Sequence, residues 1–198
     1  SMNAVETNEE SSKLTSVIAT QEDKSQGGFG LDDHRIKYGV FPFHAIVDEH
    51  GAMDTNLSPE DVERLDTLCW RAMKNQTLSR SKLGQEPRLY LRVEYDTPGY
   101  HLGDLHHGVT IDEEASAPDS EMRDVRDVTL DVTDLLNWIG DASTEIDTIH
   151  VVGSDRLTIT NEGQEATAAD LPSLLEEAGV AVHEIDVYDE FEETLPAE

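Results

Sequence analysis

The sequence predicts an α+β protein, and three segments carry that prediction. Residues 57–75 place apolar side chains at helical spacing, and residues 88–95 alternate apolar with polar side chains as a half-buried strand does. Residues 36–47 are apolar on both faces, which is typical of a buried strand. Hydrophobic residues make up 37% of the 198 residues, enough for a core in one large domain or two small ones.

Residues 1–35 are polar and rich in turn-forming residues. The loop QEDKSQGGFG carries one cation, Lys24, and one aromatic ring, Phe29. Two interpretations stay open: a mobile terminal arm, or a hairpin whose tip contacts a partner, with Phe29 available for stacking on a base.

Residues 36–47 (IKYGVFPFHAIV) are expected to form a strand that is bulged or at a sheet edge near Pro42, which lacks an amide donor. A loop is expected over residues 48–56. The helix that follows has Ser58 as its N-cap, Pro59 at its first position and Asp61 to complete a capping box. Its apolar stripe is expected to face the core and comprises Val62, Leu65, Leu68, Cys69, Ala72 and Met73.

Residues 88–95 place Leu89, Leu91, Val93 and Tyr95 on one face, which is expected to be core. The opposite face carries Arg88, Tyr90, Arg92 and Glu94, and it either lies against RNA or is the solvent face of a sheet. The order strand–helix–strand is half of a ferredoxin-like domain.

Residues 111–126 are predicted to be an acidic linker, and residues 127–198 an acidic α/β region. Strands are expected at 128–130, 146–152, 157–160 and 180–187, and helices before Gly140 and within 170–178. From Asp112 onwards there are 25 acidic residues against 3 basic ones, a net charge of −22. We expect this half to avoid phosphate and to cover the sheet or pack on a neighbouring subunit.

The whole chain carries 43 acidic and 14 basic residues, a net charge of −29. Dense carboxylates with few lysines indicate salt adaptation, so a halophilic protein is predicted. At about 1 M salt the Debye length is roughly 3 Å, and such a chain can still bind a polyanion through local contacts. An ordinary acidic protein that binds no nucleic acid is the alternative.

Six of the 14 basic residues lie between Arg71 and Arg92, in a window with a single acid. They either meet an anionic ligand such as RNA phosphate or neutralise a nearby acidic face. They are Arg71, Lys74, Arg80, Lys82, Arg88 and Arg92.

The loop over residues 76–87 is the candidate phosphate-binding segment. It offers hydroxyl, amide and cationic donors from Ser79, Arg80, Ser81, Lys82 and Gln85, and the alternative is a solvated loop. No Walker or paired-glycine motif is present in the sequence, so no nucleotide cofactor is expected.

Residues 97–108 bring together histidines and an Asp, which suggests metal binding or acid–base chemistry. The spacing of His101, Asp104, His106 and His107 matches no helical metal motif, so we expect no metal and assign these residues to a hydrogen-bonded or RNA-contacting loop. The single cysteine rules out a disulfide within this sequence and a cysteine-based zinc site. No apolar run approaches 18 residues and no signal peptide is visible, so a cytoplasmic protein without membrane contact is predicted.

Four stretches carry a resemblance to a known family: YGVFPFHAIVDEHGA, LSPEDVERLDTLCWRAM, LSRSKLGQEPRLYLRVEY and GYHLGDL. The last two are the most specific. Over roughly residues 1–110 the chain resembles the repeated backbone subunit of type I-B CRISPR interference complexes (Cascade), in the RAMP superfamily. The first strand–helix–strand half of that family's core is missing, so the chain looks like a C-terminal fragment.

The resemblance implies an RNA-recognition-like core and a thumb-like hairpin over residues 1–35, with its tip near Lys24–Gly30. It also implies a non-catalytic subunit that binds guide CRISPR RNA, stacks on other copies of itself, joins other Cascade subunits and presents the guide to target DNA. Arg80 and Lys82 would hold guide phosphates, and Phe29 would wedge between bases. The rival hypothesis is a RAMP-type endoribonuclease that uses His101, His106 or His107, with Lys82 steadying charge.

Overall fold

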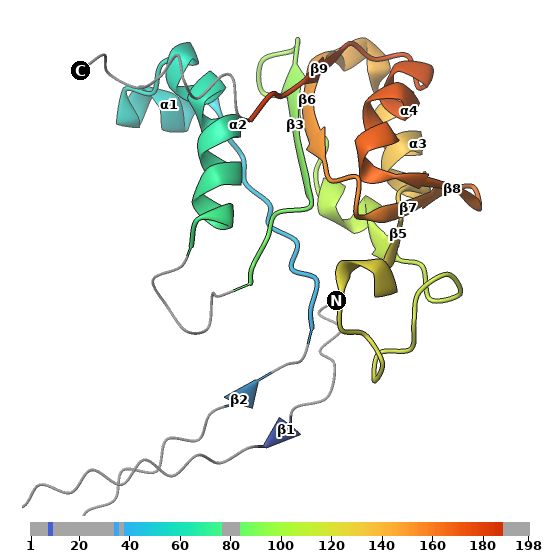
Figure 1. The fold of residues 1–198 in the computed structure, drawn as a ribbon. Helices are drawn as coiled ribbons and strands as arrows, with labels where there is room; N and C mark the ends of the chain where they lie inside the picture. Colours follow the sequence, from blue (N-terminus) through green and yellow to red (C-terminus); the bar gives the residue numbers. More distant parts are fainter. Residues whose placement is uncertain (1–7, 10–33, 36–37, 77–83, 188–198) are drawn as a thin grey trace, which may run out of the picture.

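The computed structural model describes residues 8–9, 34–35, 38–76 and 84–187, and it confirms the predicted α+β class (Figure 1). The α-helices in those residues are α1 (Glu49–Thr55), α2 (Pro59–Lys74), α3 (Thr133–Asp141) and α4 (Leu171–Glu177). Within the same residues, none of the helices has the length and apolar character needed to cross a membrane.

A three-stranded sheet forms the centre of the molecule. Its order is β3 (Leu89–Tyr95), β6 (Ile146–Gly153) and β9 (Val182–Glu184), with β3 antiparallel and β9 parallel to β6. A second sheet is ordered β4 (Thr110–Ile111), β5 (Thr129–Asp131), β7 (Thr158–Asn161) and β8 (Gln164–Thr167). In it, β5 and β7 are parallel and the other pairs antiparallel.

The short strands β1 (Asn8–Glu9) and β2 (His34–Arg35) pair antiparallel, which brings the two ends of residues 10–33 together. The predicted thumb-like hairpin, with Lys24 and Phe29, lies outside the described residues and stays a prediction.

The central sheet lies between α2 on one face and α3 with α4 on the other (Figure 1). Ile149 and Val151 of β6 are fully buried in the main core, which α3, α4 and the second sheet complete. On the opposite face, Trp70 of α2 packs in a smaller cluster with Ile185 and Val187. The strands that complete the sheet around β3 therefore come from the acidic half of the chain.

Helix α2 begins as predicted, but its buried side differs from the prediction. The Ser58 hydroxyl accepts a hydrogen bond from the amide of Asp61 at 3.2 Å, and the Asp61 carboxylate accepts one from the Ser58 amide at 3.0 Å. The buried residues are Asp66, Thr67 and Trp70, whereas Leu68 of the predicted stripe is 51% exposed. Cys69 is half-buried rather than core, and burial raises the pKa of its thiol.

The predicted strand at residues 36–47 is wrong over the part that the structure describes, because residues 38–47 form no strand. Phe41 is 52% and Phe43 71% exposed. A segment that is apolar on both faces is stable as a strand only where both faces are covered, and the exposure of Phe41 and Phe43 shows that such cover is lacking here. The predicted loop 48–56 is instead mostly helix α1, with Asp48 as its N-cap.

The predicted linker at residues 111–126 is a packed part of the folded body. Met122 and Val125 are buried in the same core as Val128. The Ser116 hydroxyl accepts a hydrogen bond from the Thr129 amide at 2.9 Å. One core therefore crosses both predicted boundaries, at 110/111 and at 126/127, because Met122 and Val125, which lie among the acidic residues, face inward.

We predict that Gly108→Ala destabilises the fold by about 1–3 kcal/mol, the range typical of overpacking. A Cβ on Gly108 would lie 2.9 Å from backbone atoms of Leu135 and from the Trp138 ring. Thermal unfolding measures the loss. Gly103→Ala is the matched control, since a Cβ there meets nothing within 4 Å; equal effects of the two substitutions would contradict the prediction.

We also predict that Asp112→Asn lowers Tm at neutral pH and that this difference disappears in acid. Hydrogen bonds from the Ala115 amide and the Thr160 hydroxyl lower the pKa of Asp112 below its usual value. The stability that its carboxylate contributes is thus present above the unfolded pKa of about 3.9 and is lost as pH falls through the folded pKa. Tm measured against pH at constant salt tests this, with Glu113→Gln as control; a difference that is constant across pH would refute it.

Candidate nucleic-acid interface

The last turn of α2 and the start of β3 flank the predicted phosphate-binding loop (Figure 1). We call these two flanking segments, with Arg71, Lys74 and Arg88, the basic end of the molecule. The central residues of that loop, Ser79, Arg80, Ser81 and Lys82, fall outside the described residues, and their RNA contacts stay a prediction.

Arg71 and Lys74 occupy the last turn of α2, where cations interact favourably with the helix dipole. Arg71 donates a hydrogen bond from Nη1 to the backbone oxygen of Val187 at 3.4 Å. This contact ties the basic end of α2 to the segment that follows β9. Gln85, on the far side of the loop, is half-buried.

Arg88 is anchored at the start of β3. Its guanidinium forms an ion pair with Glu86 and donates to the Ser154 hydroxyl at 3.5 Å, with a quarter of the side chain exposed. The Ser154 amide donates to the backbone oxygen of Arg88 at 2.9 Å. Arg88 is therefore held beside the turn that ends β6.

Arg92 lies on a face of the sheet that α2 covers, so this face is neither the RNA-facing nor the solvent-facing surface that the alternation predicted. Its guanidinium binds both carboxylate oxygens of Asp66, with Nε–Oδ1 at 2.7 Å and Nη2–Oδ2 at 3.0 Å. The side chains of Arg92 and Asp66 are 15% and 4% exposed. Burial alone would lower the pKa of Arg92, but the hydrogen bonds and charge of Asp66 and Glu94 raise it.

Tyr90 and His150 complete this network, which we call the Asp66 clamp (Asp66, Tyr90, Arg92 and His150). The Tyr90 hydroxyl donates a hydrogen bond to Asp66 at 2.6 Å. Burial raises the pKa of Tyr90, and this hydrogen bond raises it further. His150 lies beside Arg92 on β6, with Nδ1 3.6 Å from Asp66. The acidic partner was missed in the sequence, although an Asp within an otherwise apolar helix face was the available signal.

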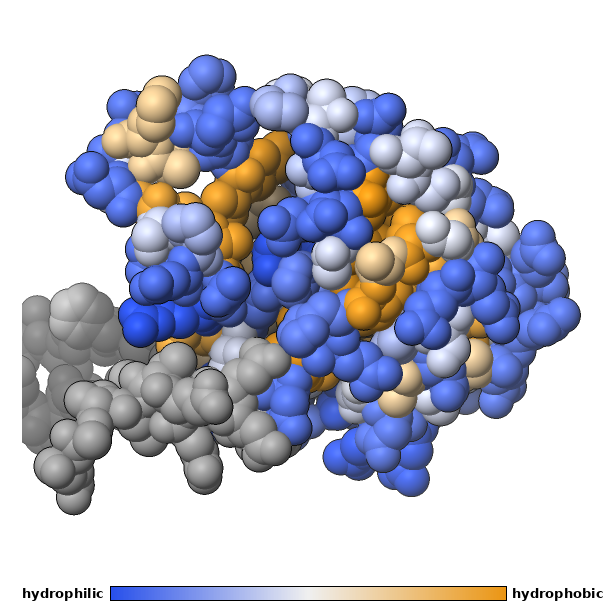
Figure 2. Space-filling model, turned by 90° about the horizontal axis from the view of Figure 1, so that it is seen from above, coloured by the Kyte–Doolittle hydropathy of each residue, from blue (hydrophilic) through white to orange (hydrophobic). Residues whose placement is uncertain are grey.

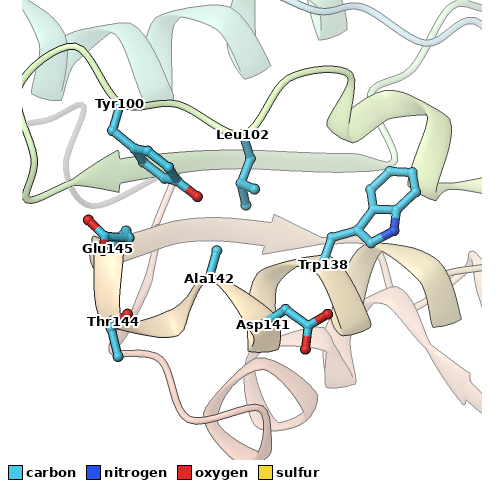
Figure 3. A pocket seen from close by; sticks show the side chains of 7 residues that line it. All are labelled: Tyr100, Leu102, Trp138, Asp141, Ala142, Thr144 and Glu145. Carbon is cyan, nitrogen blue, oxygen red and sulfur yellow. The ribbon is translucent and has the colours of Figure 1, made fainter.

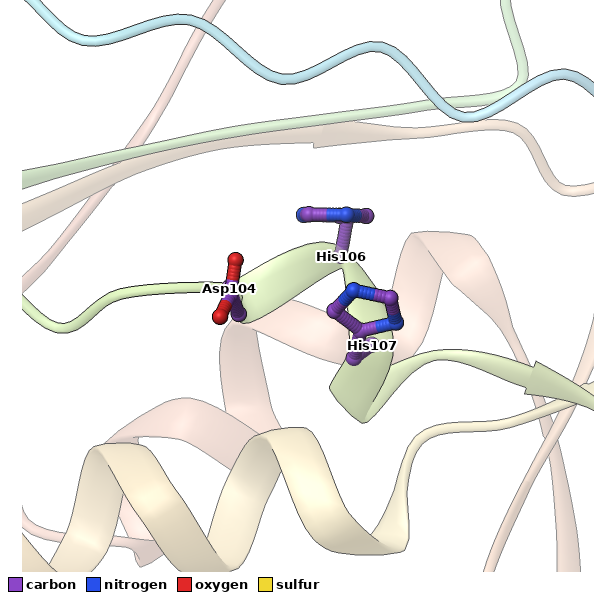
Figure 4. Close-up of side chains that lie close together, drawn as sticks. All are labelled: Asp104, His106 and His107. Carbon is purple, nitrogen blue, oxygen red and sulfur yellow. The ribbon is translucent and has the colours of Figure 1, made fainter. Parts of the chain in front are cut away.

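Three side chains of the histidine segment lie closer together than their spacing in the sequence indicated. His101 is exposed. Asp104, His106 and His107 lie at the one-turn helix η1 (Leu105–Gly108) and group beside it (Figure 4). The ring of His44 stacks on that of His106 with 5.0 Å between centroids.

An open pocket of about 440 Å³ lies between the histidine segment and the end of α3 (Figure 3). Its aromatic residues are Tyr100 and Trp138, and its acidic residues are Asp141 and Glu145. Carboxylates in the wall disfavour a phosphate ligand, so this pocket does not extend the basic end of the molecule.

Apolar side chains are exposed around α1 and α2, and Figure 2 shows hydrophobic surface on this side of the molecule. Exposed apolar side chains that gather on one side of a protein are typical of protein interfaces. The exposed residues are Phe41, Phe43, Ile46, Val47, Met53, Leu57 and Leu68.

We predict that Asp66→Ala destabilises the protein by about 3–5 kcal/mol, because it removes the buried partner of Arg92 and leaves only the exposed carboxylate of Glu94, at 3.3 Å. The double variant Asp66→Leu/Arg92→Met should recover most of that loss, since no unpaired charge remains. Urea unfolding of the single and double variants measures both values. If the double variant is as unstable as the sum of its single substitutions, the clamp does not act as a pair.

The chain is similar in sequence to proteins of one known family. Residues 1–133 match the family described as CRISPR-associated protein Cas7. A curated protein of Haloferax volcanii, also described as CRISPR-associated protein Cas7, is 55% identical over 190 residues. That alignment covers 96% of this chain and 55% of the relative, so the chain spans about half of the relative's length. The chain belongs to the CRISPR-associated Cas7 family.

Proposed function

We propose that this protein is a non-catalytic, crRNA-binding backbone subunit of a type I-B Cascade complex in cytoplasmic antiviral defence. In this role it oligomerises along the guide RNA and presents the guide to target DNA. Membership of the Cas7 family is the observation that carries the proposal. The basic end of the molecule supports it, because this end gives a polyanion a place to approach a chain of net charge −29.

The guide backbone runs past the end of α2 and the start of β3. Arg80 and Lys82 make charge-assisted contacts with phosphates, and Ser79, Ser81 and Gln85 add hydrogen bonds. Arg71, Lys74 and Arg88, anchored on either side of the loop, hold its ends and add positive field. Sequence is read by base pairing of the guide, so the protein needs only backbone contacts.

Four further residues have different parts in the proposal. Lys24 and Phe29 act from the N-terminal arm, with Phe29 stacking between bases. His101 is exposed, so its ring is accessible to the guide RNA. Arg92 acts indirectly, because its pairing with Asp66 keeps α2, and with it the basic end, on the sheet.

The exposed apolar surface around α1 and α2 supports assembly with other copies and with other Cascade subunits. Met53 is 72% exposed, and an apolar side chain so placed gains by burial against a partner. Salt adaptation also fits this assembly, since hydrophobic contacts persist where salt screens charge.

We predict that Arg80→Ala/Lys82→Ala weakens retention of crRNA about equally for unrelated guides and reduces the slope of log affinity against log salt by about 2, roughly one for each phosphate contact. Retention is measured by copurification and by filter binding over a salt series. Arg126→Ala/Arg156→Ala is the matched control, because it removes the same charge from the acidic half. Equal losses for both pairs, or none for the first, would refute the loop assignment.

Incubation of the protein with labelled precursor RNA, with and without chelator, distinguishes the endoribonuclease hypothesis from the non-catalytic role. We expect no cleavage. Cleavage that a single substitution of His101, His106 or His107 by Ala abolishes would overturn the non-catalytic role.

A further inference from the structure

We propose that Asp104, His106 and His107 bind one divalent transition-metal ion, with Zn²⁺ the ion that fits best. Each side chain offers one ligand atom, and these atoms all lie within 4.8 Å of one another. Figure 4 shows the carboxylate and the two rings carried by a single turn of chain. The proposal is independent of RNA binding.

The turn that carries the three ligands is fixed in place. Asp104 has φ 58°, a left-handed conformation, and its backbone oxygen accepts a hydrogen bond from the His107 amide at 2.7 Å. Gly108, directly after His107, packs so closely on α3 that a Cβ would lie 2.9 Å from Leu135. A rigid turn holds its ligands near their binding positions before the metal arrives, which lowers the cost of binding.

The hydrogen bonding of His106 points to a missing ligand. Within the part of the chain that the structure describes, Nδ1 of His106 is buried and finds no hydrogen-bond partner. Buried polar atoms without partners are unfavourable and commonly mark an ion or water that completes the site. The rings of His106 and His107 lie 4.1 Å apart between centroids, so their nitrogens serve one small volume.

The donor set selects the class of metal. Two imidazole nitrogens and one carboxylate suit Zn²⁺ and its first-row neighbours, whereas Mg²⁺ and Ca²⁺ prefer oxygen ligands only. Zinc bonds of about 2.0–2.2 Å require the ligand atoms to close in by roughly 1 Å. Asp104 and His107 are exposed, so rotation of their side chains can supply that movement. Water completes the coordination, as in other three-ligand zinc sites.

The experiment is titration of the whole chain with Zn²⁺ against a chromogenic chelator, in molar KCl with excess Mg²⁺. The Mg²⁺ occupies carboxylates on the acidic surface, so it removes binding that depends on oxygen ligands alone. We expect one Zn²⁺ per chain, and a visible Co²⁺ spectrum typical of tetrahedral nitrogen and oxygen coordination. Binding should be weaker in acid than at neutral pH, because protons compete with the metal for the ligand atoms.

His107→Ala and, separately, Asp104→Asn should lower zinc affinity at least tenfold. His101→Ala is the matched control, since it removes an exposed histidine of the same segment and should leave affinity unchanged. Circular dichroism confirms that each variant is folded. Binding that Mg²⁺ abolishes, binding that His107→Ala leaves intact, or an octahedral Co²⁺ spectrum would each overturn the proposal.

Discussion

The position of α2 depends on one buried interaction, the pairing of Asp66 with Arg92 and Tyr90. The helix presents few apolar residues to the sheet, and the second cluster behind it is small, built around Trp70, Ile185 and Val187. A bidentate ion pair with an added phenol hydrogen bond fixes both the rotation of α2 and its height along β3. Since α2 ends just before the predicted phosphate-binding loop, this pairing also determines the position of Arg71 and Lys74.

Charge and burial divide the molecule into two kinds of surface. The large core formed by α3, α4 and both sheets lies in the half that carries most of the acidic residues, and its outside is covered with carboxylates. Arg71 and Lys74 in the last turn of α2, and most of the large apolar residues that are exposed in the described part of the chain, lie on the side of α1 and α2. In the proposed role, concentrated salt would limit charges to a range of a few ångströms, and binding on this side would then depend on close contacts rather than on a long-range field.

The sequence predicted those features that rest on neighbouring residues. The Ser58–Asp61 capping box and the alternation of Leu89, Leu91 and Val93 are local signals, and both elements are found where expected. The buried side of α2 was not predicted, because it depends on a polar sheet face supplied by Arg92 and by residues more than 50 positions later in the chain, such as His150. The same limit explains residues 38–47, whose apolar pattern says nothing about whether other elements cover both faces.

The candidate site was predicted only in part, for the same reason. The clustering of cations along the chain indicated a candidate phosphate-binding site between the end of α2 and the start of β3. It did not indicate that Arg92 forms a buried ion pair with Asp66. Asp104, His106 and His107 fit no helical ligand motif because a one-turn 3₁₀ helix, rather than an α-helix, brings them together. The stacking of His44 on His106 joins residues 62 positions apart in sequence, which no local pattern contains.

The topology of the central sheet has a consequence for biosynthesis. Strand β3 pairs with β6, which begins about 50 residues after β3 ends, and β9 follows later still. At the usual ribosomal rate of about 5–20 residues per second, β3 waits roughly 3–10 s for its first partner. During that interval the Leu89, Leu91 and Val93 side chains lack the cover that β6 and the main core later provide, and unpaired strands of this kind favour aggregation.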